Sequence, residues 1–175
     1  MYKKVSAFSR SALKKLSFTI RKHFGCEKSC FFPIVDVLDK VRDSGEEYDN
    51  FDYEILEDND SLLVNKYAVY DAKNNKIYIS NSTYENACED DGPSRFTLVH
   101  EFAHFLLINV RCSAPKDCKK KPNVCEDPEW QADTLAAFLL VPPDLTENFS
   151  VKKIIDDCKV SEYCATLNCI KRNEE

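Results

Sequence analysis

The chain has 175 residues, of which 43% are hydrophobic and 31% charged, with a formal net charge of −6. This length suits a single domain built on one hydrophobic core. The charge is uneven, because the first 24 residues hold seven Lys or Arg and no acid, which leaves about −13 on the remainder. Such an acidic body argues against broad nucleic-acid binding, since phosphate backbones are held mainly by clusters of Lys and Arg.

Localisation and thiol chemistry follow from the same composition. No apolar run reaches the roughly 20 residues that span a bilayer, and basic residues at positions 14, 15, 21 and 22 interrupt any apolar signal-peptide core. We therefore expect a cytoplasmic protein that does not enter membranes. The nine cysteines are an odd number in a chain large enough to fold without cross-links, so reduced thiols are expected.

Two groups of cysteines leave an alternative open. Cys26 and Cys30 would lie one turn apart on a helix, and Cys112, Cys118 and Cys125 fall in the loop between the two helices that carry the motifs below. A second zinc site or a redox switch is the alternative to plain thiols, although the spacing matches no recognised zinc knuckle.

Two amphipathic helices are predicted near the start of the chain. Residues 6–23 place apolar side chains at near-helical spacing between basic ones, which predicts a helix packed on the body with its lysines in solvent. A surface for nucleic acid, an acidic partner or a membrane is the alternative for this segment. The second helix is predicted to begin near Pro33 and to end at Ser44-Gly45.

The middle of the chain predicts a small sheet. Strands are expected at Tyr53–Leu56, Leu62–Tyr70 and Lys76–Ser80, and a turn over Asp71–Asn75 joins the last two. Together they predict a meander of short antiparallel strands. Farther on, Gly92-Pro93-Ser94 supplies a break and an N-cap for the next helix.

The next helix, predicted over residues 95–108, carries the sequence RFTLVHEFAHFLLI. His100 and His104 are four apart, so they project from one face at a separation that lets two imidazoles bind one zinc. Glu101 is offset by one residue, which suits a general base acting on water rather than a third ligand. The alternative is two buried histidines beside a surface glutamate.

A catalytic zinc has three protein ligands and an open position, so one more ligand is needed. The remaining histidine, His23, lies upstream, and no histidine follows the motif, which favours a carboxylate. A helix is predicted from Asp127-Pro128 to Val141, where Pro142-Pro143 stops it. On it, Glu129 can complete the metal shell while Asp133 accepts the second ring N–H of a histidine ligand. A plain pair of acids on an exposed helix face is the alternative.

These segments resemble the ImmA/IrrE family of metallo-endopeptidases. The resemblance covers roughly residues 33–142 and rests on the segments Arg95–His104, Pro128–Asp133 and Phe138–Pro142, together with a preceding strand that ends in Ile77-Tyr78-Ile79. The family is similar to gluzincins in its ligand set. The chain departs from the usual family pattern at Phe102-Ala103, where Leu-Gly is common, and at Val141, where Met is common.

The resemblance implies an intracellular bacterial or prophage protease that cuts a helix-turn-helix repressor and so derepresses genes of a mobile element or a stress response. Carried over by position, His100, His104 and Glu129 are the zinc ligands and Glu101 is the catalytic acid/base. Manganese is the alternative metal. A non-catalytic, metal-binding sensor or antitoxin-like module that binds a repressor is the alternative function.

The expected fold is α+β: a zincin-like metallopeptidase domain over residues 31–143, with a small antiparallel sheet packed on the metal-binding helices. Residues 1–30 are expected to form a basic helical segment, and residues 144–175 a helical extension with short helices near 151–157 and 161–170. The chain offers several donors for a developing oxyanion and leaves them unranked, namely Arg95, Tyr67, Tyr70, Tyr78 and Tyr84. A sheet edge, at 62–70 or 76–80, is expected to hold a substrate peptide as an added strand.

Overall fold

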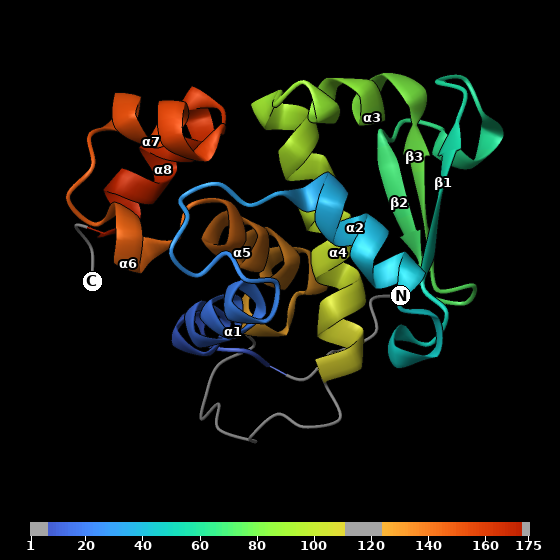
Figure 1. Ribbon diagram of the computed structural model, residues 1–175, viewed down its shortest axis with the longest axis horizontal. Coiled ribbons are helices and arrows are strands. Elements are labelled where there is room, and N and C mark those ends of the chain that lie inside the picture. The colour runs from blue at the N-terminus through green and yellow to red at the C-terminus, as the bar shows by residue number, and fades with distance from the viewer. Residues whose placement is uncertain (1–6, 111–123, 173–175) are drawn as a thin grey trace.

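The protein is described by a computed structural model over residues 7–110 and 124–172. It is a mixed helix and sheet structure, as the sequence predicts. Figure 1 shows α4 running through the middle of the molecule, with the sheet on one side and α5 on the other. In chain order the elements are α1 (Arg10–His23), α2 (Ile34–Asp43), β1 (Asp52–Leu56), β2 (Ala68–Asp71), β3 (Lys76–Ser80), α3 (Asn81–Cys88), α4 (Gly92–Val110), α5 (Pro128–Leu140), α6 (Pro143–Thr146), α7 (Val151–Cys158) and α8 (Glu162–Arg172).

The three strands pair in the order β1-β3-β2, with β1 parallel and β2 antiparallel to β3. The predicted antiparallel meander is therefore wrong, because β3 inserts between the other two strands. Its alternation explains this place: Ile77 and Ile79 are fully buried, as a central strand beside a helix layer requires. The consequence for the site is that β2 is an edge strand, and that edge lies against α4.

The strand predicted over 62–70 forms only in its last part. Asp60 accepts a hydrogen bond from the backbone N–H of Leu62 (2.8 Å) and starts a short 3₁₀ helix, Ser61–Leu63. Asn65 then adopts a left-handed conformation (φ 58°), which breaks any extended run. Turn chemistry thus outweighs the apolar pattern until Ala68.

The start of α4 differs from the prediction by three residues. Asp91, rather than Ser94, takes the N-cap role, since its carboxylate accepts from the backbone N–H (2.9 Å) and the hydroxyl (2.6 Å) of Ser94. The helix can begin at residue 92 because glycine has no Cβ. Any other residue there would place its Cβ 2.4 Å from the backbone nitrogen of Ser161, which is too close. The glycine therefore lets the chain before α8 pass directly over the start of α4.

The core lies where α4 and α5 cross and extends to the sheet. Leu98, Phe102 and Phe105 of α4 are buried, and the Phe105 ring centroid lies 4.5 Å from that of Phe51 beside the sheet. α5 is buried on nearly every side, which matches its almost continuous apolar sequence. As predicted, Asp127 caps α5 by accepting from the N–H of Glu129 (3.0 Å).

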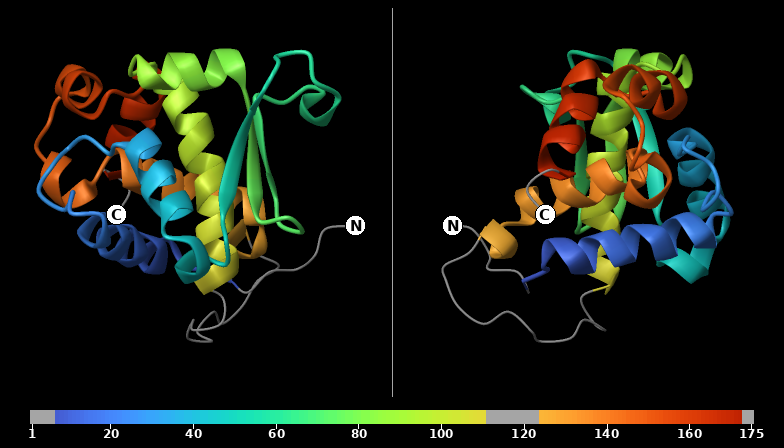
Figure 2. Two further views of the ribbon diagram at one scale, coloured as in Figure 1. Left: turned by 45° about the vertical axis from the view of Figure 1, so that its right-hand side comes forward. Right: turned by 90° about the vertical axis from the view of Figure 1, so that its left-hand side faces the viewer.

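α1 packs along α5, as Figure 2 shows from the side. Leu13 and Ile20 are buried, whereas Lys15 and Lys22 are exposed, so the prediction of a helix packed on the body is confirmed. Its N-cap is Ser9, whose hydroxyl accepts from the Ala12 N–H.

Two buried arginines tie distant segments together through backbone carbonyls. Arg95 donates to the carbonyls of Phe32 (2.7 Å), Cys158 (2.9 Å) and Lys159 (2.7 Å). Arg21 donates to the carbonyls of Leu139, Cys26 and Ser29. Because these carbonyls lie at helix ends and in loops, one buried guanidinium with several N–H donors bonds to three of them at once.

The cysteine expectations meet different outcomes. Cys26 and Cys30 lie in the loop between α1 and α2, so the prediction that one helix carries both is wrong. Cys112 and Cys118 lie outside the described residues. Cys125, Cys158 and the other cysteines whose side chains are described carry free thiols. Over residues 7–110 and 124–172, no helix has the length and apolar character needed to cross a membrane.

Candidate metal centre

The two histidines of the motif stand on the face of α4 that meets α5. The His100 and His104 side chains are 16% and 18% exposed, so they are largely shielded yet open on one side. Their ring centroids lie 4.7 Å apart, one helical turn along the same face. The position of this face follows from the apolar residues of α4, which anchor the opposite sides in the core.

The first turn of α5 brings a carboxylate to the same point. Glu129 Oε2 lies 3.2 Å from Nε2 of His100 and 3.5 Å from Nε2 of His104, and the two Nε2 atoms are 3.1 Å apart. The Glu129 side chain is 61% exposed, so it closes the site from the solvent side. Its place after the Asp127 cap keeps the carboxylate near the positive end of the helix dipole.

These three atoms form a triangle with the dimensions of a zinc site. Zinc bonds of about 2.0–2.2 Å in a tetrahedron give ligand-to-ligand edges of about 3.3–3.5 Å. The observed edges run from 3.1 to 3.5 Å. His100, His104 and Glu129 are also the group of potential ligand atoms that converges among the described residues. The donor set fits a metal and leaves a fourth position open.

Asp133, one turn along α5 from Glu129, fixes the orientation of His100. Its Oδ1 lies 2.8 Å from His100 Nδ1, so the neutral ring carries its proton on Nδ1 and turns the Nε2 lone pair toward the triangle. Burial by itself lowers the pKa of His100, but the hydrogen bond to Asp133 and the nearby carboxylates outweigh it and raise that pKa.

His104 is held in its neutral, metal-binding form. Burial lowers the pKa of His104, and the charge of His100 lowers it further, while Glu129 acts in the opposite direction. Because a neutral imidazole offers a lone pair, this environment suits a ligand.

Glu101 faces the open side of the triangle from α4. Its Oε2 accepts a hydrogen bond from the backbone N–H of Tyr70 (2.7 Å), on the edge of β2 that does not pair with β3. Burial raises the pKa of Glu101, opposed by this hydrogen bond and by the positive charges of His100 and Lys66. A carboxylate of raised basicity at this place suits the proton transfers predicted for it.

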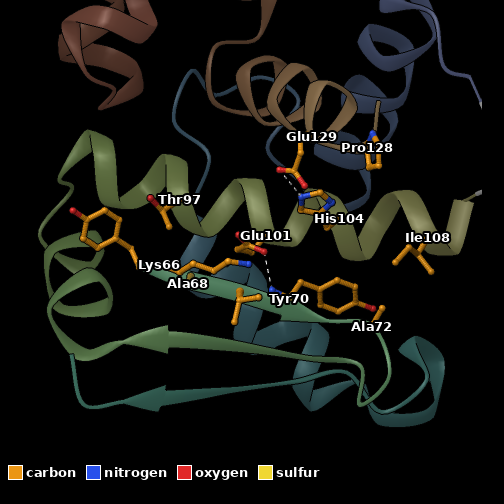
Figure 3. A pocket seen from close by; sticks show the side chains of 12 residues that line it. Lys66, Ala68, Tyr70, Ala72, Thr97, Glu101, His104, Ile108, Pro128 and Glu129 are labelled. Carbon is orange, nitrogen blue, oxygen red and sulfur yellow. Dashed lines mark hydrogen bonds and ion pairs between the residues drawn. The ribbon is translucent and has the colours of Figure 1, made fainter. Parts of the chain in front are cut away.

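A cleft of about 480 Å³ opens beside the triangle. Figure 3 shows β2 forming one wall and α4 the other, with Glu129 and Pro128 of α5 at the rim. Glu101 and His104 both face this space. A segment of extended polypeptide can therefore reach the open side of the candidate site.

The structure distinguishes the side chains that the sequence suggests as oxyanion donors. Arg95 is excluded, because it is buried and its guanidinium is committed to three carbonyls. Tyr78 and Tyr84 are not part of the cleft wall, and the Tyr84 ring stacks on that of Tyr53 instead. Tyr67 and Tyr70 do line the cleft.

Of these two tyrosines, Tyr70 has its hydroxyl bonded to Asn75 (2.8 Å), whereas Tyr67 is 73% exposed. Sequence reasoning missed Lys66, which also lines the cleft, and it missed the backbone N–H of Tyr70 as the partner of Glu101. No local signal in the sequence marks either one, because both reach the site from across the cleft.

Only one of the two strands expected to pair with a substrate has an edge free to do so in the described residues. β3 is paired on both sides and has no free edge, so the expectation for residues 76–80 is wrong. β2 keeps one free edge, which faces the cleft.

No model of a known protein family matches the chain, and no curated protein sequence matches it. The resemblance to the ImmA/IrrE family therefore rests on the sequence segments alone.

Proposed function

We propose that the protein is a zinc-dependent endopeptidase of zincin-like architecture, in which His100, His104 and Glu129 hold the metal and Glu101 is the general base. The observation that carries this proposal is the triangle of three ligand atoms, 3.1–3.5 Å on each edge, with the partly buried carboxylate of Glu101 beside its open side. Two imidazoles and one carboxylate are a ligand set that suits catalytic zinc.

A zinc ion held by His100, His104 and Glu129 would lower the pKa of water and polarise the scissile carbonyl. Glu101 takes the proton from the attacking water and delivers it to the departing amine as the C–N bond breaks. Tyr70 donates its backbone N–H to Oε2, which keeps the Glu101 carboxylate turned toward the cleft. Asp133 keeps His100 in the tautomer that presents Nε2.

The cleft supports a protein substrate in an extended conformation. β2 has no strand neighbour on the side that faces the cleft, where its Tyr70 N–H is bonded to Glu101, and this edge suits the addition of a peptide strand along the rest of its length. The motifs resemble those of peptidases that cut helix-turn-helix repressors, so we propose a repressor of this class as the substrate.

The test is a comparison of the purified protein with its Glu101→Gln variant. Each is loaded with zinc or manganese, its metal content is measured, and each is incubated with the helix-turn-helix repressor encoded nearest its gene. Glu85→Gln is the matched control, because Glu85 is an exposed glutamate of α3 outside the cleft wall.

Cleavage by the wild type and by Glu85→Gln, but not by Glu101→Gln, is the expected result, with equal metal in all three proteins. Stoichiometric metal without cleavage of this or other repressors would favour a binding module over an enzyme. Absence of bound metal in the wild type would reject the metal centre itself.

A further inference from the structure

Lys66 enters the cleft from the loop before β2, and its backbone is well fixed. The Lys66 N–H donates to the carbonyl of Leu63 (2.8 Å), and the next carbonyl, of Tyr67, accepts from the N–H of Ser80 (2.9 Å). The left-handed residue Asn65 sets the turn that directs Lys66 along the cleft. Figure 3 shows its side chain extending toward Glu101.

Charge makes this placement unusual. Among the residues the structure describes, Lys66 is the one lysine or arginine in the wall of this cleft, which also holds the acids Glu101 and Glu129. The Lys66 side chain and the Glu101 carboxylate line the same cleft and approach each other across it. Lys76 and Lys153, by contrast, form ion pairs with carboxylates of a neighbouring strand and of their own helix, respectively.

The other candidate donors are committed or less suited. Arg95 is held by carbonyls, and the Tyr70 hydroxyl is bonded to Asn75. The exposed hydroxyl of Tyr67 lines the cleft and is neutral, whereas the ammonium of Lys66 carries the full charge that a developing oxyanion requires.

We propose that Lys66 stabilises the negative charge on the carbonyl oxygen of the scissile bond, an inference that rests on the proposed peptidase function. As the water oxygen bonds to the carbonyl carbon, the π electron pair of the C=O bond moves onto the oxygen, and the Lys66 ammonium donates a hydrogen bond to it. When the C–N bond breaks, the electron pair returns to re-form the C=O bond, and the amine leaves with the proton that Glu101 took from water. The remaining proton of the attacking water passes from the new carboxyl group through Glu101 to the amine, so the products are a carboxylate and an ammonium ion, and Lys66 keeps its proton throughout.

The test uses the metal-loaded protein and a quenched-fluorescence peptide that spans the cleavage site of the repressor. Lys66→Met removes the charge and keeps most of the stem, and Lys66→Arg restores a cation. Tyr67→Phe tests the neighbouring hydroxyl, and Lys73→Met is the matched control, because Lys73 is an exposed lysine of the β2–β3 turn outside the cleft wall.

We expect Lys66→Met to lower kcat about 100-fold, the usual loss for one oxyanion donor, with KM changed less than about threefold. Lys66→Arg should recover much of kcat and Lys73→Met should stay near the wild type, while Tyr67→Phe should lower kcat less than Lys66→Met does. A phosphinic peptide, which carries a negative charge in place of the carbonyl oxygen, gives a readout besides activity. Its affinity, measured by calorimetry, should fall with kcat/KM in Lys66→Met at unchanged metal content.

The outcomes separate the two proposals. Cleavage by Lys66→Met at the wild-type kcat, or a rise of KM alone, would overturn the role of Lys66 and leave the peptidase intact. A wild type that binds metal and cuts no repressor or peptide would overturn the proposed function, and the role of Lys66 would fall with it.

Discussion

The hydrogen bond from His100 Nδ1 to Asp133 predicts a measurable loss of metal affinity when the acceptor is removed. A free neutral imidazole can carry its proton on either nitrogen, and only the form protonated on Nδ1 presents Nε2 to the metal. Asp133, at 2.8 Å, selects that form and fixes the ring. Asp133→Ala removes the acceptor, so the ring must be ordered and its tautomer selected at the expense of binding energy.

Removal of such a partner lowers metal affinity about 10- to 100-fold, or about 1.4–2.8 kcal/mol. The Asp133 side chain is 58% exposed, so its loss leaves no core cavity and the apo fold should stay intact. We would measure the zinc dissociation constant by competition with a chromophoric chelator. A pH of about 8 keeps proton competition at the histidines small.

Asp156→Ala is the matched control, because Asp156 is an exposed aspartate on α7, away from the metal triangle. Equal zinc affinity in the two variants, with an unchanged thermal midpoint of the apo protein, would refute the claim that Asp133 orients a metal ligand.

Three further predictions concern stability. Ile79→Ala, in the fully buried middle of β3, should cost about 2–5 kcal/mol in urea unfolding, and a loss below about 1 kcal/mol would contradict the central place of β3. Arg95→Met should cost at least about 2 kcal/mol by the same assay, because the carbonyls of Cys158 and Lys159 lose the guanidinium as their donor, while that of Phe32 keeps the N–H of Ile34; an unchanged midpoint would mean that water satisfies them. Zinc at about 100 times its dissociation constant should stabilise the wild type by about 2.7 kcal/mol, and thermal unfolding of His104→Ala should show almost none of this gain.

The parts that sequence predicted well depend on residues close together in the chain. The Asp127 cap and Pro128 define where α5 begins, and the i, i+4 spacing of His100 and His104 puts both rings on one face whatever the rest of the fold does. Glu129 could be predicted for the same reason, because the helix that carries it begins with a recognisable N-cap, Asp127, followed by Pro128. The candidate site was thus predicted from two local patterns, the histidine pair of α4 and the capped start of α5, and the structure brings their side chains together.

The parts that sequence missed depend on pairing between distant segments. Whether β3 lies at the centre or at the edge is decided by which faces become buried, and the pattern of each strand alone does not specify its neighbours. The N-cap at Asp91 could not be predicted for the same reason, because the start of α4 at Gly92 depends on its contact with the distant chain around Ser161. The turn-forming residues Asp60 and Asn65 are visible in the sequence. They prevent an extended strand over the apolar residues between them, so the prediction of a strand from Leu62 was wrong.

The order of the sheet has a direct consequence for the chemistry of the cleft. In the predicted meander, β2 would lie in the middle and its backbone groups would be used by strands on both sides. In the observed order β2 has a free edge against α4, so the Tyr70 N–H is available to Glu101 and the loop before β2 brings Lys66 into the cleft. The insertion of β3 between its neighbours therefore supplies both groups that act on Glu101 from outside its own helix. The candidate site thus depends on the strand order as well as on the two-histidine motif.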